Sequence, residues 1–186
     1  GCTALIPFWH PLPAVMVLRF LTGFFLAGVY PVGMKIVATW TTADRGLGIG
    51  LLVGALTLGS AGPQLLNAAG GGDWRLVLWV AAGFAAGGGL LAGAFVREGP
   101  GRVAPRTFRW DYVLEVFRNR DLRLANLGYL GHMWELYAMW SWIALYLANA
   151  LGPRASVAAF LAIAAGGLGS VAAGVLADRI GRARVT

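Results

Sequence analysis

Residues 155–177, ASVAAFLAIAAGGLGSVAAGVLA, contain no charged side chain. A helix needs about 20 mostly apolar residues to cross the hydrocarbon core of a bilayer, and this run is long enough. Residues 46–69 and 76–96 are likewise free of charge. A soluble fold of 186 residues has no interior large enough to hide so many helices that are apolar on every side. The sequence therefore predicts an all-α fold, a polytopic transmembrane helical bundle.

The composition agrees with a membrane protein, since 58% of the residues are hydrophobic and only 12% are charged. The formal net charge of +7 could suggest a nucleic-acid partner. However, the basic residues lie between the apolar runs and form no RNA- or DNA-binding motif, so no nucleic-acid partner is expected. The single cysteine, Cys2, permits no internal disulfide and leaves the redox compartment undetermined.

The apolar runs divide the chain into five complete expected spans, at about 13–38, 46–69, 75–96, 123–150 and 154–177. Residues 1–6 resemble the end of a preceding span. A polar segment, 97–123, separates the third complete span from the fourth. The chain has no initiating Met and opens inside an apolar run, so it is expected to be part of a longer protein whose remaining helices are its partners.

The basic residues predict the orientation of the spans. Twelve of the 15 Lys and Arg residues lie in 35–45, 97–123 and 179–184, all on one side. The positive-inside rule places that side in the cytoplasm. Within it, Trp110, Val113, Leu114 and Phe117 share one face of an amphipathic helix. This helix is expected to lie on anionic lipid, and a protein-docking helix is the alternative.

The orientation can be tested by thiol labelling of the full-length protein in intact cells. In a background lacking Cys2, a cysteine at position 101 is expected to resist an impermeant reagent added outside, because the rule places 97–123 in the cytoplasm. A cysteine between positions 150 and 154 is the control, and it should be labelled. Outside labelling at position 101 would overturn the orientation.

The tail GVLADRIGRAR, residues 174–184, fits the pattern G-x-x-x-D-R-x-G-x-[RK]-[RK] except at Ala183. A glycine-bearing turn can end a span, an acid at a helix end can face neighbouring helix termini, and arginines can anchor the cytoplasmic face. The alternative is a basic cytoplasmic loop with an isolated Asp. The pattern resembles the gating loop motif of the major facilitator superfamily, which recurs between helices two and three and between helices eight and nine. Its matching residues are Gly174, Asp178, Arg179, Gly181 and Arg184.

If the motif lies between helices eight and nine, the resemblance implies that the five spans are helices four to eight of twelve. It implies that 1–96 ends the N-terminal half, 97–123 is the cytoplasmic loop between the halves, and 124–186 begins the C-terminal half. The stretch RFLTGFFLAG resembles the fourth-helix motif through Arg19 and Gly23. The stretch GLLVGALTLGSAGP resembles the fifth-helix motif of exporters. It departs from that motif in two ways: the spacing from Gly59 to Gly62 is one residue short, and Leu66 and Asn67 stand where the motif has a glycine pair. The residues that match the motif are Gly50, Gly59, Gly62 and Pro63, and this partial match slightly favours export over uptake.

The stretch GYLGHMWELYAMWSWIALYL, residues 128–147, places His132 and Glu135 three residues apart near the middle of a span. An ionised acid facing lipid at that depth costs about 2.5 kcal/mol or more. Helical phase puts His132 and Glu135 in one stripe, which should therefore face protein or water; its members are Gly128, His132, Glu135, Met139, Trp142 and Tyr146. A hydrogen-bonded pair that locks two helices is the alternative to a pathway role. The resemblance implies that helices one, four, seven and ten line the central cavity, of which the fourth and seventh fall within this chain. The residues expected along the substrate or proton pathway are Arg19, Tyr30, His132, Glu135, Met139, Trp142 and Tyr146.

The function expected from these observations is secondary active transport of a small polar or anionic solute by alternating access. Arg19 and Lys35 favour that solute class, and Glu135 with His132 favours proton coupling. The protein is expected to be a multi-pass protein of the plasma (cytoplasmic) membrane. Its expected partners are lipid, the solute and protons, and no cofactor is expected. A non-transporting receptor or scaffold of the same fold is the first alternative. An intramembrane enzyme is the second, but two histidines and Cys2 supply too few groups for a metal site or a nucleophile with its base.

Overall fold

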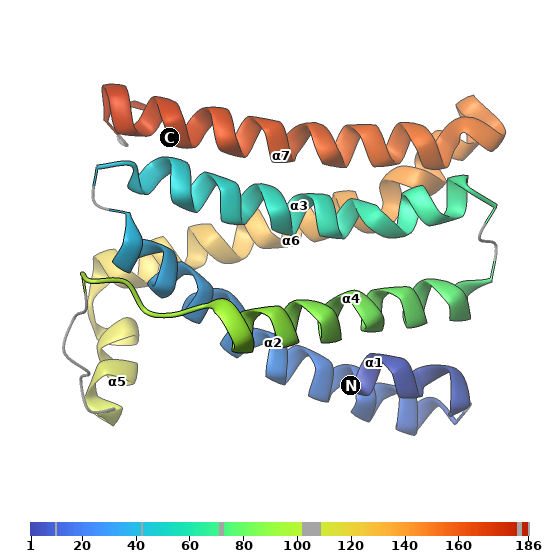
Figure 1. Ribbon diagram of the computed structural model, residues 1–186, viewed down its shortest axis with the longest axis horizontal. Coiled ribbons are helices and arrows are strands. Elements are labelled where there is room, and N and C mark those ends of the chain that lie inside the picture. The colour runs from blue at the N-terminus through green and yellow to red at the C-terminus, as the bar shows by residue number, and fades with distance from the viewer. Residues whose placement is uncertain (10, 42, 71–72, 102–108, 182–183, 186) are drawn as a thin grey trace.

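The computed structural model describes residues 1–9, 11–41, 43–70, 73–101, 109–181 and 184–185. Within these ranges every regular element is a helix, which confirms the all-α helical bundle (Figure 1). The short elements are α1 (Cys2–Leu5), η1 (Ile6–Phe8), α5 (Trp110–Arg118) and η2 (Gly152–Arg154). The long helices are α2 (Leu12–Trp40), α3 (Arg45–Ala68), α4 (Trp74–Phe95), α6 (Arg120–Leu151) and α7 (Ala155–Ile180).

The long helices have the length and hydropathy of membrane spans. This holds for α2, α3 and α4 separately, and for the stretch Arg120–Ile180 that contains α6 and α7. The chain reverses between those two helices at η2, where Gly152 has a φ of 52° that favours glycine. At 1.5 Å per residue the 22 residues of α4 already match a core about 30 Å thick. The helix bounds lie within a few residues of the spans expected from the apolar runs.

Two of these helices, α3 and α7, run side by side along their whole length (Figure 1). Gly50 and Gly54 of α3 are buried against α7, and a Cβ on Gly50 would lie 2.6 Å from the carbonyl oxygen of Ser170. Towards the other end of the pair, Ala61 and Ala159 are fully buried. Small residues let helix backbones approach closely where lipid supplies no hydrophobic driving force between helices. We call this contact the α3–α7 seam.

The small-residue spacing in the sequence predicts part of this seam. Gly50/Gly54 and Ser170/Gly174 both lie in it. The equally spaced pairs of α4, Gly83/Gly87 and Gly89/Gly93, have no neighbour within 4 Å of an added Cβ among the described residues. Small residues spaced four apart therefore indicate a helix face that permits close approach, but they do not predict which helix packs against it.

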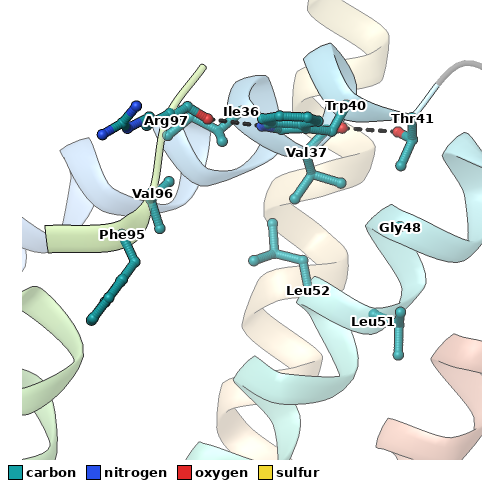
Figure 2. A pocket seen from close by; sticks show the side chains of 10 residues that line it. All are labelled: Ile36, Val37, Trp40, Thr41, Gly48, Leu51, Leu52, Phe95, Val96 and Arg97. Atoms are coloured by element: carbon teal, nitrogen blue, oxygen red, sulfur yellow. Dashed lines mark hydrogen bonds between the residues drawn. The ribbon is translucent and has the colours of Figure 1, made fainter. Parts of the chain in front are cut away.

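The chain that follows α4 lies across the end of α2 (Figure 2). The indole Nε1 of Trp40 donates a hydrogen bond to the carbonyl oxygen of Arg97 at 2.8 Å. Thr39 accepts from Gly99 N at its Oγ1, at 2.9 Å, and from Gly101 N at its carbonyl oxygen, at 3.2 Å. Gly99 is buried there, and an added Cβ would collide with the backbone of Thr39. These bonds join the ends of α2 and α4.

The helix α5 lies near the start of α6, at the end of the bundle where α7 finishes (Figure 1). Its charged residues include Asp111 in the first turn and Arg118 in the last, where each favours the helix dipole. Asn119 then begins α6, since its Oδ1 accepts hydrogen bonds from the backbone N–H groups of Asp121 and Leu122. A capped break thus separates α5 from the long apolar helix α6.

Candidate solute cavity and interhelical contact

Helices α2, α3, α6 and α7 surround a cavity of about 710 Å³. Its aromatic and imidazole side chains come from α2 and mainly from α6, and they are Tyr30, Tyr129, His132, Tyr137 and Trp140. The hydroxyl groups of Thr57 and Ser170 also lie at its wall, and each donates to a carbonyl oxygen of its own helix. Apolar side chains form most of the remaining wall, including Leu26, Val53, Leu56, Met133, Leu136, Met139 and Ile163.

The structure brings three of the expected pathway residues to this cavity, namely Tyr30, His132 and Met139. Arg19 is exposed, and helical spacing places it one turn before Gly23 on the cavity-facing side of α2. The described wall therefore ends one turn short of this arginine.

The other expected residues of α6, Glu135, Trp142 and Tyr146, are exposed and lie outside the described cavity wall. Helix α6 turns the face that includes Leu136 towards the cavity, and Glu135 is about 100° around the helix from that residue. The stripe expected from helical phase is thus divided, with His132 and Met139 on the cavity side.

Three aromatic residues of the wall were not selected from the sequence: Tyr129, Tyr137 and Trp140. The rings of Tyr137 and Trp140 meet edge to face, with centroids 5.4 Å apart. The Nε1 of Trp140 is buried and has no hydrogen-bond partner among the described residues. With Met133 and Leu136, these residues follow helical spacing along α6, which is the sequence signal that could have revealed this face.

A second cavity of about 760 Å³ lies between the end of α2, the start of α3 and the chain after α4 (Figure 2). Its polar side chains are either hydrogen-bonded within the protein or point away from the cavity. Thr41 Oγ1 donates to the carbonyl oxygen of Val37 at 2.9 Å, and the guanidinium of Arg97 points away from Leu51. The cavity between α2, α3, α6 and α7 offers more groups for binding, so we take it as the candidate solute cavity.

The other candidate functional element is a contact between α7 and the beginning of α3. Asp178 lies in the last turn of α7, and its Oδ1 and Oδ2 accept hydrogen bonds from Gly46 N at 2.7 Å and Leu47 N at 2.9 Å. The local N-cap residue, Asp44, makes no side-chain capping bond to α3. Asp178 therefore caps α3 from another helix.

The electrostatics of the two helix ends favour this arrangement. A carboxylate at the end of its own helix meets the negative end of that helix dipole, which is unfavourable. The first N–H groups of α3 have no partner within their own helix, and they carry the positive end of the α3 dipole. The hydrogen bonds from Gly46 and Leu47 stabilise the Asp178 carboxylate at the positive end of the α3 dipole, and they give two of the first N–H groups of α3 an acceptor.

The remaining motif residues have distinct positions. Gly174 is buried where its Cβ would collide with the carbonyl oxygen of Gly46, and Gly181 ends α7 with a φ of 91°. Arg179 and Arg184 are exposed. In the fifth-helix motif, Gly50 lies in the α3–α7 seam, whereas an added Cβ on Gly59 or Gly62 would meet no atom of the described chain within 4 Å, and Pro63 lies inside α3.

Lys35, the second cation considered for the solute, lies close to an acid. Its Nζ is 3.5 Å from Oε1 of Glu98 in the chain after α4, and both side chains are about half exposed. Within the described ranges, no group of three His, Cys, Asp or Glu side chains is placed to hold a metal ion.

A family model described as Major Facilitator Superfamily matches residues 1–186. The chain belongs to the major facilitator superfamily. This confirms the resemblance carried by the tail motif, and it identifies a multi-pass integral membrane protein of a transporter family rather than an enzyme family. Searches of curated proteins and of solved structures found no match to the chain.

Proposed function

We propose that this member of the major facilitator superfamily is a secondary active transporter that moves a small solute by alternating access through the α2/α3/α6/α7 cavity. The arrangement of the cavity carries the proposal. Two of its helices, α2 and α3, fall in the proposed N-terminal half (1–96), and the other two, α6 and α7, fall in the proposed C-terminal half (124–186). A site shared by two halves can change its exposed side when the halves rock against each other.

The Asp178 contact supplies the gate in this proposal. It joins α3 to α7, and hence the two proposed halves, at the end of the bundle that the basic residues assign to the cytoplasm. While Asp178 holds Gly46 and Leu47, the cytoplasmic end stays closed. Opening towards the cytoplasm requires these hydrogen bonds to break, which gives the chain a two-state element of the kind that gating requires.

Proton coupling is proposed to run through Glu135 and His132. The imidazole of His132 lines the cavity, and Glu135 follows it by three residues on α6, a spacing at which helical side chains are neighbours. An ionisable side chain inside a span is costly unless it serves a pathway or finds a partner. The carboxyl of Glu135 would bind a proton from one side of the membrane and release it to the other, with export slightly favoured and the plasma membrane as the setting.

Replacing Glu135 with Gln tests this coupling, because Gln keeps the size of the side chain and removes its titration. The full-length protein in proteoliposomes, under an imposed pH gradient and against a panel of solutes, should lose uphill transport by tenfold or more. Exchange of solute for solute should persist. Glu115→Gln on α5, outside the long helices, is the matched control and should transport normally.

Two results would contradict the proposal at different levels. Uphill transport with intact pH dependence in Glu135→Gln would make this acid structural, as in a His–Glu pair that locks helices. Absence of any solute flux through folded wild-type protein would favour the receptor or scaffold alternative.

The expected solute class, polar or anionic, rested on Arg19 and Lys35. Neither residue is part of the described cavity wall, and Lys35 lies beside Glu98. Arg19 lies one turn beyond the described wall on the cavity-facing side of α2, so a polar or anionic organic solute stays within the proposal.

A further inference from the structure

The helix α5 (Trp110–Arg118) runs across the axes of the long helices, at the end of the bundle where α6 begins (Figure 1). Since the long helices cross the membrane, a helix that runs across their ends lies along the membrane surface rather than through it. With nine residues it is about 14 Å long, which is also too short to span the hydrocarbon core. The orientation of α5 is therefore that of an interfacial helix.

One face of α5 is apolar and exposed. Leu114 and Phe117 are 53% and 68% exposed, and helical spacing places Trp110, four residues before Leu114, on the same face. The most enclosed side chain of α5 is the half-buried Val116, which is about 100° around the helix from Phe117. The apolar face is thus distinct from the more enclosed side of α5, and it can enter the headgroup region of a bilayer.

The acidic residues of α5 lie away from this face. At about 100° per residue, the exposed side chains of Asp111 and Glu115 point about 120° and 160° away from Phe117. Asp111 also accepts a hydrogen bond from the guanidinium of Arg109 at 2.7 Å, which pairs its charge locally. With the apolar face on a bilayer, both carboxylates would be turned towards water and away from anionic phosphates.

The basic residues at the end of α5 lie beside the apolar face. Arg118 follows Leu114 by four residues, so it stands one turn further along the same edge of the helix. Arg120 begins α6 and is exposed, and the Nη1 of Arg123 donates a hydrogen bond back to the carbonyl oxygen of Phe117 at 3.1 Å. We call Arg118, Arg120 and Arg123 the α5 arginine group. Arginine stems can lie along apolar surface while their guanidinium groups reach the phosphates of an anionic leaflet.

We propose that α5 docks on the anionic lipid of the membrane leaflet at its end of the bundle, with Leu114 and Phe117 in the headgroup region and the α5 arginine group on lipid phosphates. This partner accounts together for the orientation of the helix, its exposed apolar face and the separation of its acids from the arginines. Because Asn119 caps α6 directly after α5, docking also fixes the depth at which α6 enters the bilayer. The inference concerns a surface outside the solute cavity, and it stands apart from the proposed function.

A fluorescent label at Leu114→Cys tests the docking in the full-length protein with no other cysteine. Nitroxide-labelled lipid quenches the label from the bilayer, and iodide quenches it from water. In nanodiscs that contain phosphatidylglycerol, we expect quenching by the lipid to be about threefold stronger, or more, at Leu114→Cys than at Glu115→Cys, the matched control on the polar side of the helix. In nanodiscs of phosphatidylcholine alone, this difference should be lost.

Three results would overturn the inference and leave the transport proposal standing. Strong quenching by iodide at both positions would show that α5 lies in water. Shielding of Leu114→Cys from both quenchers would show that protein covers the apolar face, as in the protein-docking alternative. Equal quenching by lipid with and without phosphatidylglycerol would show that anionic lipid has no part in the docking.

Arg118→Gln tests the charge, because it removes one guanidinium and keeps a side chain that favours a helix. With the label at Leu114→Cys, the ratio of docked to undocked α5 in phosphatidylglycerol nanodiscs should fall about fivefold, the effect expected for one basic residue at an anionic surface. Arg75→Gln is the matched control, since Arg75 is exposed in the first turn of α4, at the other end of the bundle. It should leave the ratio unchanged, and equal effects of the two substitutions would overturn the role of the α5 arginine group.

Discussion

Gly50→Ala is expected to abolish transport and to destabilise the protein by about 2 kcal/mol, within the range for overpacked interiors. The added Cβ would lie 2.6 Å from the carbonyl oxygen of Ser170 and 3.3 Å from the Cα of Val171. Both contacts are backbone atoms, which cannot rotate away as the end of a side chain can. The helices α3 and α7 must then separate, and the Asp178 contact at the end of the same seam would be lost with them.

The measurement for Gly50→Ala combines thermal unfolding of the purified full-length protein with solute flux in proteoliposomes. Gly83→Ala on α4 is the matched control, because nothing described lies within 4 Å of the added Cβ. It should leave flux unchanged and stability equal or slightly higher, since Ala favours a helix over Gly by up to about 1 kcal/mol. Equal behaviour of the two variants would show that the α3–α7 seam does not set the helix separation.

Asp178→Asn should lower flux about tenfold while the protein stays inserted, folded and able to bind solute. Asn can accept a hydrogen bond, but it lacks the charge that favours the positive end of the α3 dipole. Hydrogen bonds to a charged group contribute about 1.5–3 kcal/mol, so losing about 2 kcal/mol would shift the closed and open states by about thirtyfold. The cytoplasmic end would then spend more time open, and the cycle would slow.

Asp73→Asn is the control for this substitution. The Oδ1 of Asp73 accepts from Arg75 N at 2.9 Å and caps the start of its own helix, α4, without joining two helices. It should cost a little stability and no flux. Unchanged flux in Asp178→Asn, at normal expression, would remove Asp178 from the gating mechanism.

The sequence was sufficient for the helices and their bounds, because charge-free runs such as 155–177 have few alternatives in a bilayer. The last expected span ended at residue 177, whereas α7 continues to Ile180 and is ended by Gly181 of the motif. The cap on α3 could not be predicted from the sequence. Nothing near Asp44 shows that its side chain makes no capping bond, or that Asp178, far along the chain, provides one.

The face of α6 that lines the cavity could not be predicted from periodicity alone. Aromatic residues occur all around this helix, so several stripes through His132 were equally consistent with helical phase. Packing of α6 against α7 and α3 selects the face of Trp140 and leaves Glu135 outside the described wall. That choice depends on tertiary contacts between distant segments, which a single sequence does not display.

The most direct test of alternating access across the α3–α7 seam is the distance, in the working protein, between the helix ends that the Asp178 contact joins. Spin labels at Arg45→Cys and Ile180→Cys, both exposed positions, report it by double electron–electron resonance in full-length protein lacking Cys2. We predict two distance populations whose ratio changes between acidic and neutral buffer, with Asp178→Asn enriching the longer one. A single distance, unaffected by pH and by Asp178→Asn, would contradict the account.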